Sequence, residues 1–415
     1  MNILYIVPYI PNPIRVRPYS LIRFLAERGH AVTLATVGSE QQELADFNSM
    51  RSLTHHSKLA VMPRWRSLWN SFKALPGPVP IQAVYSWKPE FAAQLVHLFK
   101  HTDGKAPFDI IHVEHLRGVL YGLHLKTKLQ KMDIHVPVVW DSVDCISYLF
   151  RQASHQSATR RSRWLTRFEL ARTESYEHWL SRQFDRVLVT SKTDKQAFLS
   201  LIETSDPDPP ITVLQNGVDL EYFTADPHVV RDISTVVISG KMSYHANVSM
   251  VLNFVRELLP LVRDKVPTIK LVIVGKDPPR EIRALERESG IKVTGTVEDV
   301  RPYLQGASVS VSPVTYGAGI QNKVLEAMAC GTPVVATPKA VSALDVEPGK
   351  DLLVAQETES FATAVLFLLE DAELRMRVGN AGRIYVEKNH DWKQIVTELE
   401  EIYHDVIDAK RRAHS

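Results

Sequence analysis

Residues 317–336 read GAGIQNKVLEAMACGTPVVA. This pattern predicts a glycine loop, a short helix, a tight turn and a buried strand. Glycines let a backbone approach a ligand closely, and the first turn of a helix presents unpaired N–H groups and the positive end of the helix dipole. The loop and the helix start therefore predict an anion site, most simply for a phosphate. Glu326, further along the helix, is placed to accept hydrogen bonds from a sugar or ribose hydroxyl.

Short apolar runs alternate with helical stretches on both sides of this segment, which is typical of parallel sheets with right-handed crossovers. The alternation predicts two doubly wound α/β domains, with ligands bound in a cleft beyond the carboxyl ends of their strands. A proline-rich segment at 204–210 is interpreted as the linker, which gives domains of residues 1–208 and 209–391. The expected strands are 3–7, 31–36, 110–113, 136–140 and 187–190 in the first domain, and 212–214, 235–239, 270–274, 292–294, 309–311 and 333–336 in the second.

Composition sets the broad class of the protein. A length of 415 residues with 45% apolar and 23% charged residues fits a globular enzyme of two domains. The net charge of +2 gives no reason to expect a nucleic-acid partner. Cys145 and Cys330 are too few for a disulfide framework, so a reducing, cytoplasmic location is expected. The chain begins with a predicted strand rather than a signal peptide, and no run reaches the roughly 18 apolar residues of a membrane span.

Several segments fall in a characteristic order along the chain: Arg28–Thr33, Asn216–Asp219, Gly240–Asn247, Gly295–Tyr303 and the segment quoted above, followed by Gly349–Val354 and Asp391-Trp392. In this order they resemble the retaining nucleotide-sugar glycosyltransferases of family 4, which have the GT-B fold, and in particular the bacterial branch associated with surface-polysaccharide assembly. The resemblance implies transfer of a sugar from a UDP- or GDP-linked donor to an acceptor hydroxyl, with the anomeric configuration kept. It further implies a donor site on the second domain, a saccharide or lipid-linked acceptor on the first, and a last helix within 392–415 that packs back on the first domain.

The resemblance also assigns roles to residues of the second domain. Glu326 matches the glutamate that binds the nucleotide ribose, and Lys241 matches a basic residue that contacts the diphosphate. Asn247 stands where relatives often have a second lysine, so Lys323 is a candidate for the missing charge; alternatively, Lys323 caps or solvates its helix. Thr296 and Val297 are expected near the base unless they only pack the strand end. The remaining candidates for contact with the donor sugar are Gly317, Ala318 (where relatives usually have a glutamate), Gly319, Ile320, Gln321 and Asn322.

In the first domain, the resemblance points to a predicted strand end at 112–115. Glu114 and His115 are candidates for contact with the donor sugar or the acceptor, although a lone histidine is more often structural. Arg15 and Arg17, in the first strand-to-helix loop, are expected to reach the diphosphate or else to face solvent. Two acidic side chains near the end of another strand, Asp141 and Asp144, are candidates for positioning the acceptor.

Neither a metal nor another cofactor is expected. Asp206-Pro207-Asp208 superficially matches a metal-binding motif, but its place in the linker does not offer the rigid ligands that a metal site needs.

Two segments mix aromatic side chains with cations: residues 64–73, and a second stretch containing Trp164 with Arg160, Arg161, Arg163, Arg167 and Arg172. Both are candidates for peripheral contact with the inner face of an anionic membrane. The alternative is a solvated helix face above a buried aromatic stripe.

The expected chemistry is front-face attack on the anomeric carbon, in which the donor phosphate takes the acceptor proton and the cations stabilise the leaving diphosphate. Two other functions remain open. One is a GT-B-like nucleotide-sugar isomerase of the 2-epimerase type, and the other is an inactive protein that only binds a nucleotide sugar. A dehydrogenase is disfavoured because the first predicted strand runs into Pro8-Tyr9-Ile10-Pro11 and lacks the glycine fingerprint of dinucleotide binding.

Overall fold

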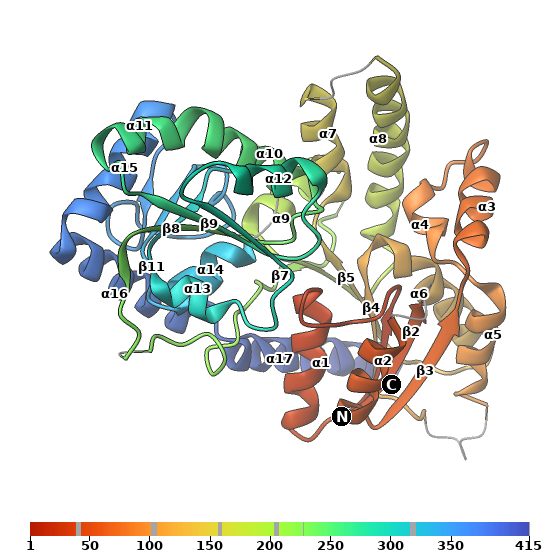
Figure 1. Ribbon diagram of the computed structural model, residues 1–415. Helices are drawn as coiled ribbons and strands as arrows, with labels where there is room; N and C mark the ends of the chain where they lie inside the picture. The colour runs from red at the N-terminus through yellow and green to blue at the C-terminus, as the bar shows by residue number, and fades with distance from the viewer. Residues whose placement is uncertain are drawn as a thin grey trace. The chain divides into compact units, whose positions relative to one another are not determined.

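A computed structural model describes residues 1–38, 43–100, 106–156, 160–202, 207–226, 228–315 and 321–414, and gives side chains for these residues except 153–166. The chain divides into two compact units. The first unit comprises Met1–Gln215 and Trp392–Ser415, and the second comprises Asn216–Asp391. Each unit contains one parallel sheet with helices around it, so the predicted α/β class is confirmed (Figure 1).

The first unit has a seven-stranded sheet in the order β3-β2-β1-β4-β5-β6-β7. Every neighbouring pair is parallel, as the predicted crossover connections require. The strand order reverses between β1 and β4, and the carboxyl ends at such a switch point are where doubly wound sheets bind ligands. The strands are β1 Asn2–Val7, β2 Ala31–Gly38, β3 His56–Val61, β4 Ile110–Glu114, β5 Val138–Val143, β6 Arg186–Val189 and β7 Ile211–Val213.

The helices of the first unit include one from the far end of the chain, α17. Its apolar face, including Trp392, Leu399 and Tyr403, shares a buried core with Tyr5 of β1 and Leu21 of α1. The last helix is thus an integral part of the first core. The helices are α1 Val16–Glu27, α2 Glu43–Leu53, α3 Arg64–Ala74, α4 Ile81–Tyr85, α5 Pro89–His97, α6 His115–Gln130, α7 Ile146–Gln156, α8 Arg160–Leu180, α9 Lys192–Leu199 and α17 Trp392–Arg412.

The second unit has a six-stranded parallel sheet in the order β10-β9-β8-β11-β12-β13, with its switch point between β8 and β11. The strands are β8 Asp232–Ser239, β9 Lys270–Val274, β10 Ile291–Gly295, β11 Ala307–Ser312, β12 Val334–Ala336 and β13 Leu353–Val354. The helices are α10 His245–Asn253, α11 Leu259–Lys265, α12 Arg280–Ala284, α13 Arg301–Gly306, α14 Asn322–Ala329, α15 Thr358–Glu370 and α16 Ala372–Asn389, with a π turn at Phe254–Leu258 and a 3-10 turn at Leu285–Arg287.

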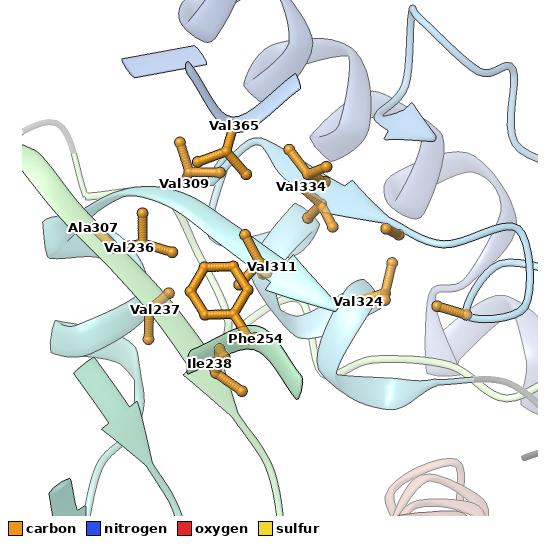
Figure 2. Close-up of a cluster of buried hydrophobic side chains, with 14 of the residues drawn as sticks. Val236, Val237, Ile238, Phe254, Ala307, Val309, Val311, Val324, Val334 and Val365 are labelled. Atoms are coloured by element: carbon orange, nitrogen blue, oxygen red, sulfur yellow. The ribbon is translucent and has the colours of Figure 1, made fainter. Parts of the chain in front are cut away.

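The core of the second unit holds the helix of the quoted segment in place. Figure 2 shows Val236 and Ile238 of β8, Val311 of β11 and Val324 of α14 in the same buried cluster as Phe254. Fully burying a valine or phenylalanine side chain contributes about 1.5–3 kcal/mol. Anchoring α14 through Val324 therefore fixes where its first turn lies relative to the ends of β8 and β11.

The boundary between the two units differs from the predicted linker. The strand expected to open the second domain at 212–214 is β7, which pairs with β6 in the first sheet, and the chain divides after Gln215. Part of the proline-rich segment, residues 204–206, lies outside the described residues. Proline breaks regular structure without separating domains, so here it precedes an edge strand. The edge strand β3 was also not predicted, because only one of its six residues is buried and its apolar pattern is weak.

Both cysteines are free and buried. Within the described part of the chain, no helix is long and apolar enough to cross a membrane.

Candidate active site

In the second unit, glycines follow two adjacent strands and bring their loops together. Gly240 follows β8 with φ at 141°, and Gly275 follows β9 with φ at 151°. A Cβ atom on Gly275 would lie 1.7 Å from the Gly240 carbonyl oxygen, so the close approach of these two loops requires glycine. The result is a half-buried backbone edge at the carboxyl ends of β8 and β9.

Asn247 holds Lys323, a predicted phosphate-binding residue, beside this edge. The Asn247 side-chain amide donates to the Lys241 carbonyl at 2.9 Å, and the Lys323 Nζ donates to Asn247 Oδ1 at 2.5 Å. Lys323 Cε also lies within 3.7 Å of the Cβ position of Gly240. A single asparagine therefore links the loop after β8 to the first turn of α14, and it directs the Lys323 ammonium towards that loop.

The charges of Lys323 and Glu326 respond to their partial burial. Burial lowers the pKa of Lys323 to about 8, against the opposing effect of Glu326. Burial likewise raises the pKa of Glu326 to about 7, although Lys323 lowers it. Within the described residues, the Glu326 carboxylate and the Lys241 ammonium have no hydrogen-bond or ion-pair partner. Glu326 is attracted by the charge of Lys323 without forming a close ion pair, so both groups can accept a ligand without first breaking a hydrogen bond or ion pair with those residues.

Three buried polar atoms at the same strand ends lack a partner among the described residues. They are Ser239 Oγ at the end of β8, Ser312 Oγ at the end of β11, and Asn322 Oδ1 at the start of α14. A buried polar atom without a partner costs free energy, so such atoms at a switch point are suited to binding a polar ligand.

A hollow of about 330 Å³ lies beyond the end of β10. Thr296 lines it, together with Gly295, Thr294, Pro278 and Arg283. Its position at the same edge of the sheet suits the base of a nucleotide, which is where Thr296 and Val297 are predicted to act. Val297 packs partly buried against the core.

The predicted glycine-loop residues Gly317, Ala318, Gly319 and Ile320 lie outside the described residues. Gln321 is the N-cap of α14, and Asn322 is its first residue.

In the first unit, Glu114 ends β4 inside a buried hydrogen-bond network. Its carboxylate accepts hydrogen bonds from the hydroxyls of Tyr9 at 2.8 Å and Tyr5 at 3.4 Å. Burial and the nearby Asp141 raise the pKa of Glu114 to about 8, so its neutral form is favoured at pH 7. On the same strand, His112 is bonded through Nδ1 to the Tyr403 hydroxyl of α17 at 2.7 Å.

Arg17 forms a buried ion pair instead of facing solvent. Its Nε lies 2.7 Å from Asp141 Oδ2 and its Nη1 donates to the Leu214 carbonyl at 3.0 Å, with 5% of the residue exposed. Burial alone would raise the pKa of Asp141, but Arg17 and His112 outweigh it and hold that pKa below its ordinary value. The alternative in which Arg17 faces solvent is therefore wrong: the two side chains neutralise each other and join β5 to α1 and the chain after β7. The expected contacts of Arg17 with the diphosphate and of Asp141 with the acceptor stay predictions.

The other predicted arginine also has partners within its own unit. Arg15 donates to the Ile10 carbonyl at 2.8 Å, pairs with Glu43 at 3.2 Å, and lies over the Tyr9 ring at 5.0 Å. It remains partly exposed, so a ligand contact at Arg15 stays a prediction.

Backbone strain marks the ends of two strands in the first unit. His115 begins α6 with φ at 61°, and Val143 ends β5 with φ at 70°. A β-branched residue in this region is a genuine outlier, and such strain is concentrated at functional sites. Burial and Arg117 lower the pKa of His115 to about 4, which leaves a neutral imidazole at pH 7. Asp144, just beyond Val143, has a pKa raised to about 7 by burial and Asp194.

The sequence did not reveal Tyr5, Tyr9 and Tyr403 as partners of this site. Tyr5 and Tyr403 occupy positions that read as ordinary apolar core, and their hydroxyls meet Glu114 and His112 only after distant segments assemble. An aromatic hydroxyl aimed at a strand end gives no periodic signal. In the described part of the chain, no group of three or more His, Cys, Asp or Glu side chains could hold a metal ion.

Two ranges that make up most of the chain match glycosyltransferase family models. Residues 15–222 match the model described as Glycosyltransferase Family 4, and residues 233–371 match the model described as Glycosyl transferases group 1. The chain belongs to this glycosyltransferase family, and its two sheets are those of the GT-B fold.

Individual relatives agree with this assignment. The D-inositol 3-phosphate glycosyltransferase of Stackebrandtia nassauensis is 29% identical over 249 residues, which is 55% of this chain and 55% of that protein. The sucrose-phosphate synthase of Thermosynechococcus elongatus has the same fold, with a TM-score of 0.68 at 18% identity over 99% of this chain and 100% of that one. Anabaena HepE, crystallised with UDP and glucose, gives a TM-score of 0.65 at 15% identity over 98% of this chain and 100% of that one. The chain spans about half the length of the curated relatives it matches, from 37% to 55%.

Proposed function

We propose that the protein transfers a sugar from a UDP- or GDP-sugar to an acceptor hydroxyl in glycan or exopolysaccharide synthesis, with the anomeric configuration retained. The observation that carries the proposal is that Asn247 holds the Lys323 ammonium beside the loop of Lys241, through hydrogen bonds to Lys323 Nζ and to the Lys241 backbone carbonyl, at the switch point of the second sheet. The complex of Anabaena HepE with UDP and glucose supports a donor of this class. The donor then binds the second unit and a saccharide or lipid-linked acceptor binds the first.

The two lysines supply the charge that a diphosphate needs. Lys241 extends from the loop after β8 and Lys323 from the first turn of α14, where the helix dipole adds to the positive potential. Because partial burial lowers the pKa of Lys323 to about 8, an incoming dianion gains from its full protonation. Glu326 accepts hydrogen bonds from the ribose hydroxyls, and the hollow beside Thr296 holds the base.

In the proposed reaction, the acceptor oxygen forms a bond to the anomeric carbon on the face from which the diphosphate departs. The bond between the anomeric carbon and the phosphate oxygen breaks, and that phosphate takes the acceptor proton. The products are the glycoside and a nucleoside diphosphate. Lys241 and Lys323 stabilise the negative charge that develops on the leaving group, so the enzyme's contribution is electrostatic.

Residues of the first unit shape the sugar and acceptor side of the reaction. Glu114, held by the Tyr9 hydroxyl, and the neutral imidazole of His115 present hydrogen-bonding groups at the end of β4. The φ of 61° at His115 fixes how this side chain leaves the strand. We assign both residues to contacts with the donor sugar or the acceptor hydroxyl.

The experiment that tests the function uses the purified full chain with a panel of UDP- and GDP-sugars. Released nucleoside diphosphate and new glycoside are measured with each donor alone and with a mixture of saccharide and polyprenyl-linked acceptors. Acceptor-dependent release of the diphosphate with a retained anomer is expected, and Lys241→Ala abolishes it while the distant Lys265→Ala does not. Conversion of the donor sugar without an acceptor identifies an isomerase, and tight binding without turnover identifies an inactive binder; either result overturns the proposal.

A further inference from the structure

The helix α3 presents its apolar face outward. Trp65, Leu68, Trp69 and Phe72 are 66%, 65%, 50% and 63% exposed. Their spacing of i, i+3, i+4 and i+7 places them on one face of the helix, and together they line a shallow groove. The aromatic stripe expected from the sequence is thus exposed, and the alternative in which it is buried is wrong.

The inward face of α3 is polar and is firmly attached to the unit. Ser67 is buried, and the Asn70 side-chain amide donates to the carbonyls of Val84 at 3.1 Å and Trp87 at 2.8 Å. Surface helices of globular proteins normally bury their apolar stripe and expose polar residues. In α3 this polarity is inverted, so packing against its own unit does not explain the aromatic residues.

Further contacts fix both ends of the helix. Arg66, near its start, pairs with Glu90 at 2.7 Å. Arg172 of α8 donates to the carbonyl of Ala74, the last residue of the helix, at 2.5 Å and also to the Val79 carbonyl beyond it. The exposed face is therefore preformed, which lowers the ordering cost of binding.

The sequence around α3 is strongly basic. Residues 47–89 contain six cations, Arg51, Lys58, Arg64, Arg66, Lys73 and Lys88, and no aspartate or glutamate. The chain as a whole is nearly balanced, with 49 Lys and Arg against 47 Asp and Glu. The local excess is thus a feature of this segment. Lys73 lies over the Trp69 ring at 5.1 Å, which places a cation at the rim of the apolar face.

We propose that α3 docks this protein on the surface of an anionic lipid bilayer. Exposed tryptophans beside cations suit the headgroup region, where an indole ring meets both apolar chains and polar groups. The basic segment complements an anionic leaflet, whereas a second copy of this chain would bring the same positive charge against itself. This docking depends only on α3 and is independent of the proposed sugar transfer. It can therefore be tested without an active donor site.

The test is flotation of the full chain with two kinds of vesicle, one of phosphatidylcholine and one containing phosphatidylglycerol. We expect binding to the anionic vesicles that weakens as salt rises. The triple variant Trp65→Gln, Trp69→Gln, Phe72→Gln reduces the partition coefficient by more than about tenfold. Lys73→Gln reduces it by about fivefold. The matched control is Phe367→Gln, Met376→Gln, Ile384→Gln in the second unit, which also removes three exposed apolar side chains and leaves binding unchanged.

A second measurement shows which side chains enter the lipid. Lipids brominated along their acyl chains quench tryptophan fluorescence when the ring reaches that depth. We expect quenching in the natural chain that falls in Trp65→Phe, Trp69→Phe, a variant that keeps an apolar face and still floats. Absence of flotation on anionic vesicles, or equal flotation of the Gln variant and its control, overturns the proposal. Self-association that disappears in the Gln variant, without vesicle binding, shows that a second copy occupies the face and also overturns it.

Discussion

The two sheets carry polar clusters of opposite character at the carboxyl ends of their strands. In the first unit, Arg17, Asp141 and Glu114 bind one another or their neighbours and are buried, although the buried Thr190 hydroxyl beyond β6 has no partner among the described residues. In the second, Lys241 and Glu326 have no partner among the described residues, and Ser239 and Ser312 hold buried hydroxyls without one there. A satisfied cluster stabilises its own fold, whereas an unsatisfied one gains most from a ligand. We infer that the second unit provides most of the binding free energy for the donor.

The largest expected effect is on the buried ion pair of the first unit. Arg17→Met leaves Asp141 buried without its cation, and the free energy of unfolding is expected to fall by about 3–5 kcal/mol. Arg15→Met, which removes a partly exposed arginine from the same loop, costs less than about 1 kcal/mol. Urea denaturation followed by far-UV circular dichroism measures both. Near-natural stability in Arg17→Met together with weakened UDP binding would make Arg17 a donor ligand and break the contrast between the two clusters.

The next effect is a pH dependence that comes from Glu114. Its pKa in the folded chain is about 8, against an ordinary value of 4.5, because burial and Asp141 disfavour the charged form. Between about pH 5 and pH 8, the folded chain holds an extra proton at this carboxyl, so the free energy of unfolding falls as pH rises, by up to about 1.4 kcal/mol per pH unit. Glu114→Gln carries no charge at any pH and is expected to remove this part of the slope. An unchanged slope in the variant would show that Glu114 ionises normally.

In the second unit, the matching pH effect is on affinity. Burial lowers the pKa of Lys323 to about 8, and only the protonated form attracts the diphosphate. Above about pH 8, the dissociation constant for UDP is therefore expected to rise by roughly tenfold per pH unit. Lys323→Arg keeps its charge in this range and is expected to bind UDP with little pH dependence. Isothermal titration at several pH values measures both chains, and identical profiles would exclude Lys323 from the phosphate site.

The smallest expected effect is on the free energy of unfolding, at a buried hydroxyl of the second unit. Ser312→Ala removes a buried hydroxyl that has no partner among the described residues, so its stability should stay within about 0.5 kcal/mol of the natural chain. Thr332→Val is the control, because the Thr332 hydroxyl donates to the Leu304 carbonyl at 2.7 Å and accepts from Arg231 at 2.9 Å. Its loss leaves those groups unpaired and costs about 1–3 kcal/mol. Equal losses in the two variants would show that Ser312 is a structural residue.

Periodicity predicted the buried parallel strands well. The segment expected at 270–274 is β9, and those expected at 235–239 and 309–311 lie within β8 and β11. Such strands are buried on both faces and read as continuous apolar runs. The edge strands were harder: β3 was not predicted and β7 was placed in the wrong domain, because an edge strand has few buried residues and its partner is set by tertiary contacts.

In the candidate site, too, tertiary contacts decide pairings that the local sequence does not predict. A motif can point to Lys241 and Lys323, but only the fold brings the Lys323 ammonium and the Lys241 backbone carbonyl to the side chain of Asn247, which lies 76 residues before Lys323. Conversely, Arg17 reads as an exposed loop cation, yet its helix turns it towards Asp141, 124 residues further along the chain. Pairings across such distances depend on strand order and register rather than on local sequence.

The central claim is that Lys323 supplies the second cation of the donor site, and moving that charge tests it most directly. UDP titrations compare the natural chain with Lys323→Ala, the transposed variant Asn247→Lys, Lys323→Ala, and the distant control Lys265→Ala. We expect Lys323→Ala to weaken UDP binding by roughly tenfold to a hundredfold, the transposed variant to regain most of the loss, and the control to bind normally. Unchanged UDP affinity in Lys323→Ala, with binding abolished in Lys241→Ala, would contradict the claim.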